Sequence, residues 1–231
     1  MYLFLIRHGQ SEGNVAGRLQ GWQDAPLTPL GEQQAIRAAT ALATFLQAAG
    51  VSVATVYSSP LQRALRTADV ISQAIGAPLE IDPGLREMHF GRIEGLTDAE
   101  WKDCFPELLP DWHRHDNLDF GWPEGETRRA FYTRIEQAID GIVARQAPGA
   151  NPVIVAHGGV ISSYLSHLTT GEWHHWRRFS VGNCSITHVT LEPDRPTPPA
   201  MSCLLRFNET SHLDDPDVEA VTGEEDAGSA A

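Results

Sequence analysis

Cysteine, basic residues and long apolar runs are all scarce in this chain of 231 residues. The three cysteines, Cys104, Cys184 and Cys203, form no CxxC pair, which argues against a disulfide framework and a zinc site and favours a reducing compartment. No run approaches the roughly 18 apolar residues of a membrane span. The opening run Tyr2–Ile6 is too short for the core of a signal peptide, and Arg7 interrupts it. The sequence therefore predicts a cytoplasmic protein without a membrane segment.

The shortage of basic residues gives a formal net charge of -13, from 17 Lys and Arg against 30 Asp and Glu. Such a chain does not bind nucleic acid or anionic membranes through bulk electrostatics, so an anionic substrate needs a local cluster of basic side chains. Residues Glu209–Ala231 hold eight of the acids and neither Lys nor Arg. We expect a folded domain over 1–208 and an acidic disordered tail over 209–231.

Short apolar runs alternate with amphipathic segments along the chain. The runs predict strands, the last two near a sheet edge, at Tyr2–Ile6, Ala54–Tyr57, Leu79–Ile81, Pro152–Ala156, Ile186–Leu191 and Met201–Phe207. Helical patterns lie between them, including Thr127–Ala144 and Val160–Leu168. This alternation predicts an α/β domain with a largely parallel sheet. A segment rich in Trp and His, about 97–123, interrupts this alternation of strands and helices and is interpreted as a lid insertion.

Two helix starts carry recognisable signals. Thr28 is expected to cap a helix with Pro29 at its first position, an inward face that includes Ile36, and an end at Gly50. The run Ser59-Pro60-Leu61-Gln62 has the spacing of a capping box, so Ser59 is expected to cap the next helix.

Charged side chains follow four of the predicted strands. They are Arg7 and His8, Arg63, Glu87, and His157. Because ligands of open parallel sheets bind at the carboxyl ends of strands, these side chains are expected to meet there.

Each residue type suits phosphoryl transfer. Arginine neutralises a phosphoryl dianion through paired donors, and a neutral imidazole can attack phosphorus and hold the phosphoryl group. A second histidine adds a donor, and a carboxyl group with a raised pKa can protonate the leaving alkoxide. The scheme requires no metal.

The sequence resembles the histidine phosphatase superfamily, which also contains the cofactor-dependent phosphoglycerate mutases, over roughly residues 1–191. The resemblance rests on five motifs in the family's order: Leu5-Ile6-Arg7-His8-Gly9-Gln10-Ser11-Glu12-Gly13-Asn14, Gly21-Trp22-Gln23-Asp24-Ala25-Pro26-Leu27-Thr28, Ser58-Ser59-Pro60-Leu61-Gln62-Arg63-Ala64, Leu85-Arg86-Glu87 with Phe90-Gly91, and Val155-Ala156-His157-Gly158-Gly159. It implies a doubly wound, mostly parallel sheet with helices on both faces and an antiparallel edge strand.

The resemblance also implies a role for each matching residue. His8 is expected to be the phosphorylated nucleophile, Glu87 the proton donor, and Arg7, Arg63 and His157 the rest of the phosphate pocket. Further phosphate contacts are expected from Asn14, Gln20, Gly21 and Gly158, with neither metal nor cofactor.

Several residues compete for these roles. Arg66 is a rival of Arg63, although most helical arginines pair with surface acids, and Glu94 and Glu126 are rivals of Glu87. The pairs His113/His115 and His174/His175 lack companion ligands, so lid or surface roles are favoured over metal binding. The aromatic residues of the lid are interpreted as a small satellite core, with an apolar wall for a bulky substrate as the alternative.

Hydrolysis is favoured over mutase activity because the lid contains only two basic residues, Lys102 and Arg114, among seven acids. We expect a broad-specificity phosphatase acting on small phosphorylated metabolites. The alternatives are a cofactor-dependent phosphoglycerate mutase, a non-catalytic phospho-ligand-binding protein and a metal-dependent hydrolase. The physiological substrate and the oligomeric state stay open, and a homodimer paired through Met201–Phe207 is one alternative.

Overall fold

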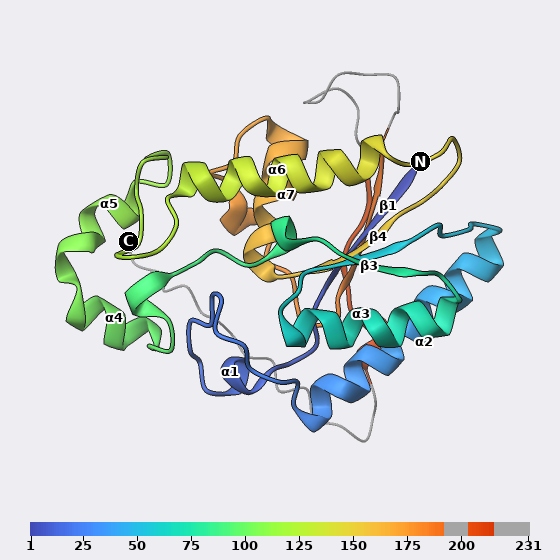
Figure 1. Cartoon of the computed structure of the whole chain (residues 1–231), viewed down its shortest axis with the longest axis horizontal. Coiled ribbons are helices and arrows are strands. Elements are labelled where there is room, and N and C mark those ends of the chain that lie inside the picture. Colours follow the sequence, from blue (N-terminus) through green and yellow to red (C-terminus); the bar gives the residue numbers. More distant parts are fainter. Residues whose placement is uncertain (192–202, 215–231) are drawn as a thin grey trace.

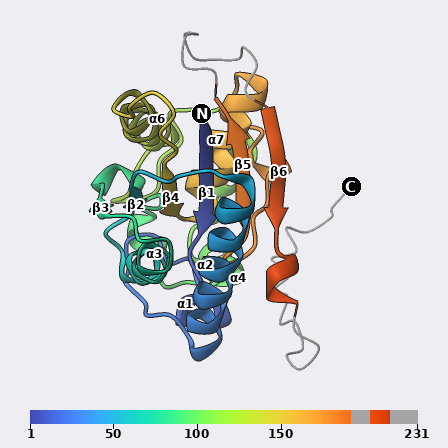
Figure 2. The same cartoon turned by 90° about the vertical axis from the view of Figure 1, so that its right-hand side faces the viewer.

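The computed structural model describes residues 1–191 and 203–214, and within them six strands form one sheet (Figures 1 and 2). The strands are β1 Tyr2–Arg7, β2 Val56–Ser58, β3 Leu79–Ile81, β4 Val153–Ala156, β5 Ile186–Thr190 and β6 Cys203–Glu209. Their order across the sheet is β3-β2-β4-β1-β5-β6, in which the first four are parallel, β5 is antiparallel to β1, and β6 pairs antiparallel with β5 and so runs in the direction of β1. The predicted mostly parallel sheet is confirmed, with the correction that its antiparallel strand, β5, lies one place in from the edge.

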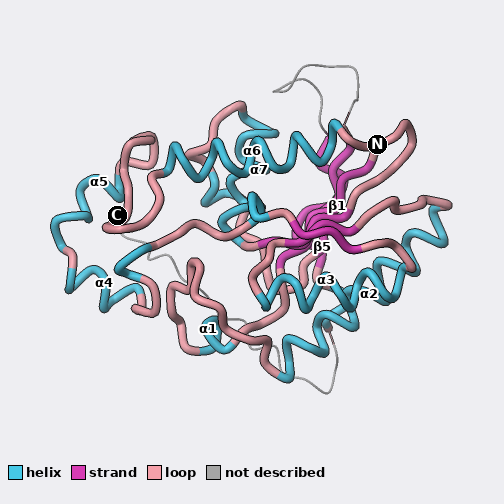
Figure 3. Tube along the Cα trace, in the orientation of Figure 1, coloured by secondary structure: helices cyan, strands magenta, loops and turns pink. Residues whose placement is uncertain are grey.

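Helices cover both faces of this sheet. They are α1 Glu12–Val15, α2 Pro29–Ala49, α3 Gln62–Ile75, α4 Asp98–Cys104, α5 Leu109–His113, α6 Arg128–Ala144 and α7 Gly158–Thr170. Figures 1 and 3 show α2 and α3 on one face and α6 and α7 on the other, which is the doubly wound arrangement. No helix in the described ranges is long and apolar enough to cross a membrane.

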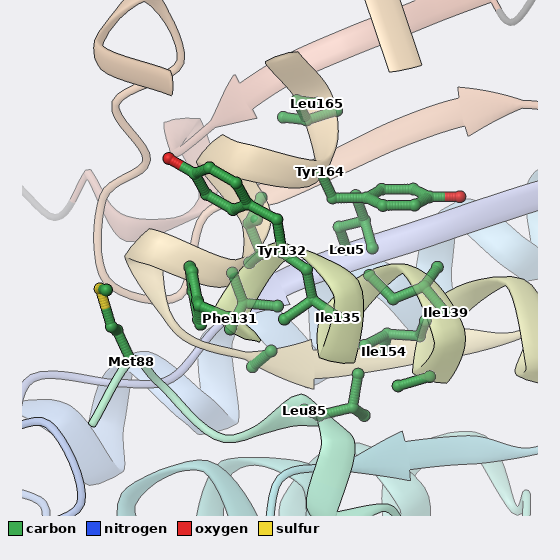
Figure 4. Packing of buried hydrophobic residues seen from close by; sticks show 14 of the residues in the cluster. Leu5, Leu85, Met88, Phe131, Tyr132, Ile135, Ile139, Ile154, Tyr164 and Leu165 are labelled. Carbon is green, nitrogen blue, oxygen red and sulfur yellow. The ribbon is translucent and has the colours of Figure 1, made fainter. Parts of the chain in front are cut away.

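Alternate residues of the central strands feed two separate cores. In β1, Leu3 and Leu5 belong to the cluster beneath α6 and α7, whereas Phe4 and Ile6 belong to the cluster beneath α2 and α3. Figure 4 shows Leu5 and the β4 residue Ile154 in one cluster with the α6 side chains Ile135 and Ile139. Because successive strand side chains point to opposite faces, a continuous apolar run is needed when both faces are covered.

The two helix starts turned out differently. Thr28 caps α2 as expected, its Oγ1 accepting a hydrogen bond from the Gly31 N–H, and Gly50 ends the helix. Ile36 was expected on the inward face but is 55% exposed. The other expected inward positions, Ala39, Leu42 and Leu46, are buried, and the buried face of α2 is completed by Gly31, Ala35 and Ala38.

The capping-box prediction for Ser59 is wrong. The helix α3 begins at Gln62 with Leu61 at its N-cap, and that end has no side-chain cap hydrogen bond. Ser59 lies two residues earlier, and its hydroxyl accepts a hydrogen bond from the Leu61 N–H.

The lid is an extension of the core on the α6 and α7 side. Trp101, Phe120 and Trp122 are buried. The Trp122 ring meets the Phe120 ring edge to face at 4.9 Å and the Trp101 ring at 5.3 Å, measured between ring centroids. The Arg128 guanidinium lies over the Trp112 and Phe120 rings, at 5.1 and 4.6 Å, and donates to lid carbonyls. These contacts support the satellite-core interpretation, with the correction that this core is continuous with the main one.

The described fold extends past the expected boundary at residue 208. Glu209 is the last residue of β6, and Ser211–Leu213 form a short 3-10 helix beside α2, where Arg37 donates to the Leu213 carbonyl oxygen. The tail predicted over 209–231 therefore begins no earlier than residue 215. Residues 192–202 and 215–231, with the proline-rich connection and the rest of the tail, lie outside the described residues.

Two glycines in helices make a matched test of this packing. A Cβ on Gly31 would collide with the backbone carbonyl of Gln10, whereas one on Gly141 in α6 would meet only the flexible end of Arg145, at 3.4 Å. We expect Gly31→Ala to lower the free energy of unfolding by about 1–3 kcal/mol. Gly141→Ala should raise it by about 0.5–1 kcal/mol, because glycine disfavours the helix. Urea denaturation measures both, and equal effects would contradict the close approach.

Candidate active site

The pairing of β1 with β4 brings the two site histidines to adjacent strand ends. Arg7 lies opposite Ala156 in the parallel register, and the His8 N–H donates to the Ala156 carbonyl oxygen at 3.0 Å. His157 follows Ala156 directly. The imidazole rings of His8 and His157 consequently lie 5.1 Å apart, at an interplanar angle of 60°.

The buried His8 imidazole is held in one tautomer. Its Nδ1 lies 2.7 Å from the Gly9 carbonyl oxygen, which can only accept, so Nδ1 carries the proton and Nε2 keeps its lone pair. Burial, followed by the charges of Arg63 and Arg7, lowers the His8 pKa well below 6.5, although the Gly9 bond acts the other way. The ring is therefore neutral near neutral pH.

Arg63 reaches the site from the first turn of α3. Its side chain is buried, and its two terminal nitrogens donate to the Gln23 and Gly21 carbonyl oxygens at 2.8 and 2.7 Å. Its Nε is buried without a hydrogen-bond partner among the described residues. Burial lowers the Arg63 pKa, with Glu87 as the largest opposing charge, and the guanidinium stays protonated.

Arg7 enters from the end of β1. One terminal nitrogen donates to the Val181 carbonyl oxygen at 2.7 Å. The guanidinium lies against the start of α7, because a Cβ on Gly158 would be 3.6 Å from the Arg7 Nε. Arg7 therefore brings a second positive charge to the two histidines.

His157 is fully buried, and burial followed by the charge of Arg63 lowers its pKa well below 6.5. Its Nε2 lies 2.8 Å from the Ser59 Oγ. Its Nδ1 is also buried and has no hydrogen-bond partner within the described part of the chain.

Glu87 lies at the N-terminus of α7. Its Oε2 accepts from the Gly159 N–H and its Oε1 from the Met88 N–H, both at 2.9 Å. Burial raises the pKa of this carboxyl group, while these two bonds and the charges of Arg63 and Arg7 oppose the rise. A Cβ on Gly159 would collide with the carboxylate, so glycine is required there for the approach.

The two rival carboxylates are engaged elsewhere. Glu94 accepts from the backbone N–H groups of Trp22, Gln23 and Phe90. Glu126 forms a partly buried ion pair with Arg134 at 2.7 Å. Neither is placed like Glu87, at the start of α7.

Arg66, the rival of Arg63, is a surface residue as expected. It pairs with Glu32 at 3.0 Å and with Asp69 at 3.2 Å, and its side chain is half exposed. Arg63 is therefore the arginine that α3 turns toward the histidines.

The other predicted phosphate contacts surround the site in different ways. The Asn14 Oδ1 accepts from the Ser11 N–H at 3.0 Å, and the Ser11 Oγ, which has a single proton to donate, lies 2.9 Å from both the Asn14 Oδ1 and the Gln20 Oε1. The Gly21 carbonyl holds Arg63, while Gly158 opens α7. Asn14 and Gln20 thus fix the loop after His8, and Gly21 fixes the Arg63 side chain.

Sequence reasoning missed two groups that hold the site. The Asn183 Nδ2 donates to the His8 carbonyl oxygen at 3.0 Å and lies 3.3 Å from the Asn14 Oδ1. The Trp22 Nε1 donates to the Glu87 carbonyl oxygen at 2.8 Å. Asn183 belongs to no motif, and the only signal for it is that β5, which follows it, pairs with β1.

The two histidine pairs lie away from any metal-binding arrangement. His115 packs near Trp112 and Trp176, and the rings of His174 and His175 lie 4.1 Å apart, tilted by 51°. Across residues 1–191 and 203–214, no group of three His, Cys, Asp or Glu is placed to hold a metal ion.

Comparisons with known proteins agree with this geometry. The profile of the histidine phosphatase superfamily (branch 1) matches residues 3–203. A protein of Escherichia coli K12 named "Probable phosphoglycerate mutase GpmB" is 33% identical over 196 residues, or 83% of this chain and 86% of the relative.

Two solved structures are also similar. The α-ribazole phosphatase of Shigella flexneri has a TM-score of 0.75 and 28% identity over 90% of this chain and 96% of that one. A mycobacterial glucosyl-3-phosphoglycerate phosphatase has a TM-score of 0.70 and 30% identity over 82% and 92%. Sequence, fold and site geometry together show that this chain belongs to branch 1 of the histidine phosphatase superfamily.

Proposed function

We propose that this protein is a phosphomonoester hydrolase that passes the phosphoryl group of a small metabolite to His8 and then to water. The observation that carries this proposal is the His8 Nε2, whose lone pair is kept by the hydrogen bond from Nδ1 to Gly9. The two arginines and His157 around it supply donors for the phosphoryl oxygens. The scheme uses no metal ion or cofactor.

In the first step, the His8 Nε2 attacks phosphorus and the ester P–O bond breaks. Arg7, Arg63 and His157 neutralise charge on the phosphoryl oxygens as they move. The Glu87 carboxyl group, whose pKa is raised by burial, gives its proton to the leaving alkoxide. The enzyme then holds phosphohistidine and ionised Glu87.

The second step restores the enzyme. Water attacks phosphorus while the Glu87 carboxylate takes a proton from it, and the P–N bond breaks. The electron pair of that bond returns to the His8 Nε2, and inorganic phosphate leaves. Glu87 thus serves as acid and then as base.

The lid favours water over a second phosphorylated substrate as the acceptor. Its two basic residues already have carboxylate partners: Lys102 pairs with Asp98, and Arg114 lies 3.6 Å from Asp111. A bisphosphorylated intermediate would need cations free to bind its second phosphate. This supports hydrolysis over the mutase alternative, despite the mutase name of the bacterial relative.

The substrate class follows from the relatives. The two phosphatases with similar structures are named for α-ribazole and for glucosyl-3-phosphoglycerate. We propose a small phosphorylated metabolite with an alkyl or sugar leaving group, for which Glu87 supplies the proton. The free thiols of Cys104 and Cys184 support a reducing, cytoplasmic setting.

Replacing His8 tests the proposal directly. We expect His8→Ala to lower phosphate release from p-nitrophenyl phosphate and 3-phosphoglycerate by more than about a thousandfold, with chelator present throughout. His113→Ala, an exposed histidine of the lid, is the control and should keep wild-type activity. Wild-type activity in His8→Ala would overturn the proposal. Interconversion of 3- and 2-phosphoglycerate without phosphate release would show the mutase alternative.

Glu87→Gln tests the acid. Because kcat/KM reports the steps up to departure of the leaving group, in which Glu87 acts as the acid, kcat/KM for 3-phosphoglycerate should fall about 10²–10⁴-fold. The kcat/KM for p-nitrophenyl phosphate, whose leaving group needs little protonation, should fall much less. Glu80→Gln, an exposed carboxylate on β3, is the matched control. Equal losses for both substrates would show that Glu87 is not the proton donor.

The pKa shifts predict the pH profile of wild-type kcat/KM. The rising limb should lie well below pH 6.5, because the pKa of His8 is lowered. The falling limb should lie above pH 4.5, because burial raises the pKa of Glu87 and activity requires its proton. Glu87→Gln should lose the falling limb, and a falling limb kept in that variant would assign it to another group.

We also propose that two copies pair through β6. It is one of the two edge strands of the described sheet, and Leu205 and Phe207 are 47% and 38% exposed on it. Analytical ultracentrifugation should find a dimer for the wild type and a monomer for Leu205→Lys. A monomeric wild type would contradict the pairing.

A further inference from the structure

Ser59 stands in an unusual position for a serine before a helix. It does not cap α3, although its spacing resembles that of a cap. Its side chain is fully buried, as is that of His157. Its Oγ lies 2.8 Å from the His157 Nε2 and 3.3 Å from the Leu61 N–H, which donates to it.

These contacts decide which way the hydrogen bond to His157 runs. The Leu61 N–H already uses one lone pair of the Ser59 oxygen, and His157 is the one acceptor within reach of the hydroxyl proton among the described residues. If Nε2 donated instead, both the Ser59 hydroxyl proton and the Nδ1 lone pair would be buried without a partner among the described residues, whereas donation from Ser59 leaves only the Nδ1 proton unpaired. The Ser59 O–H therefore donates to Nε2.

The direction of this bond fixes the proton on the other nitrogen of the ring. A neutral imidazole that accepts at Nε2 carries its proton on Nδ1. That Nδ1 is buried without a partner in residues 1–191 and 203–214. The cationic side chains that act on the ring most strongly are Arg63 and Arg7. A donor left free among such cations is suited to an anion.

We propose that Ser59 is a positioning residue that holds His157 as its Nδ1–H tautomer, so that Nδ1 donates to the phosphoryl oxygens. Without this bond, the tautomer with a lone pair on Nδ1 becomes accessible, and that lone pair would face the negative charge of the phosphoryl group. The role of Ser59 is exerted through His157 and rests on the proposed phosphohistidine chemistry.

The resting enzyme tests the tautomer without any turnover. In protein labelled with ¹⁵N-histidine, long-range ¹H–¹⁵N correlation spectra identify the His157 ring by its loss in His157→Asn. We expect a protonated Nδ1 and an unprotonated Nε2 in the wild type, and a mixture or the opposite tautomer in Ser59→Ala. A protonated Nε2 in the wild type, or no change in Ser59→Ala, would overturn the proposal.

Kinetics provide the second measurement. Ser59→Ala should lower kcat by about tenfold with little change in KM, less than the loss caused by removing a donor outright. Ser59→Thr, which keeps the hydroxyl, should restore most of the activity. Equal kcat in Ser59→Ala and the wild type would overturn the proposal.

Ser58→Ala is the matched control. Ser58 is equally buried and adjacent, but its hydroxyl donates to the Ser59 carbonyl oxygen, at 2.8 Å, and not to His157. Ser58→Ala should keep the wild-type tautomer and kcat. If it lost as much kcat as Ser59→Ala, the loss in Ser59→Ala would come from disturbed packing and not from the hydrogen bond to His157, which would overturn the proposal. Failure of the phosphohistidine proposal itself would appear separately, as activity retained in His8→Ala.

Discussion

Parallel pairing of β1 with β4 places both histidines, because Arg7 and Ala156 are register partners and the next residue of each strand is a site histidine. The neighbouring strand β2 pairs with β4 as well, so Ser59 and the start of α3 lie beside His157. Helix α7 begins at the same edge, and the Gly159 N–H in its first turn donates to Glu87. One register thus assembles residues that are separated by up to 150 positions in the chain.

The electrostatics of the site follow from placing positive charges around buried imidazoles. The chain carries a net charge of -13, yet two arginines and two histidines gather at this point, with Glu87 as the adjoining carboxylate. Burial and the arginines keep both imidazoles neutral, which preserves a lone pair on the His8 Nε2. Hydrogen-bond donors for a phosphoryl anion therefore lie beside the His8 Nε2, which can act as a nucleophile. Phosphoryl transfer requires both.

Local sequence signals predicted the strands and most helices, and strand-end logic brought Arg7, His8, Arg63, Glu87 and His157 together. The errors arose where a local signal competed with a distant contact. Ser59 has the spacing of a helix cap, but helix α3 begins later in the chain. The Ser59 hydroxyl forms a hydrogen bond with His157 instead, 98 positions away. The contact of Asn183 with His8 depends on the antiparallel β1–β5 pairing, which no motif encodes. Ile36 shows that an apolar residue one position out of phase on a helix faces solvent.

The central claim is that the phosphoryl group passes through His8, and trapping it there is the most direct test. Enzyme mixed rapidly with a ³²P-labelled phosphomonoester, quenched in base and digested should yield one labelled peptide, containing His8. The label should be stable to base and labile to acid, and its decay should keep pace with turnover. Steady release of phosphate without a labelled enzyme, or a label on any other residue, would contradict the account.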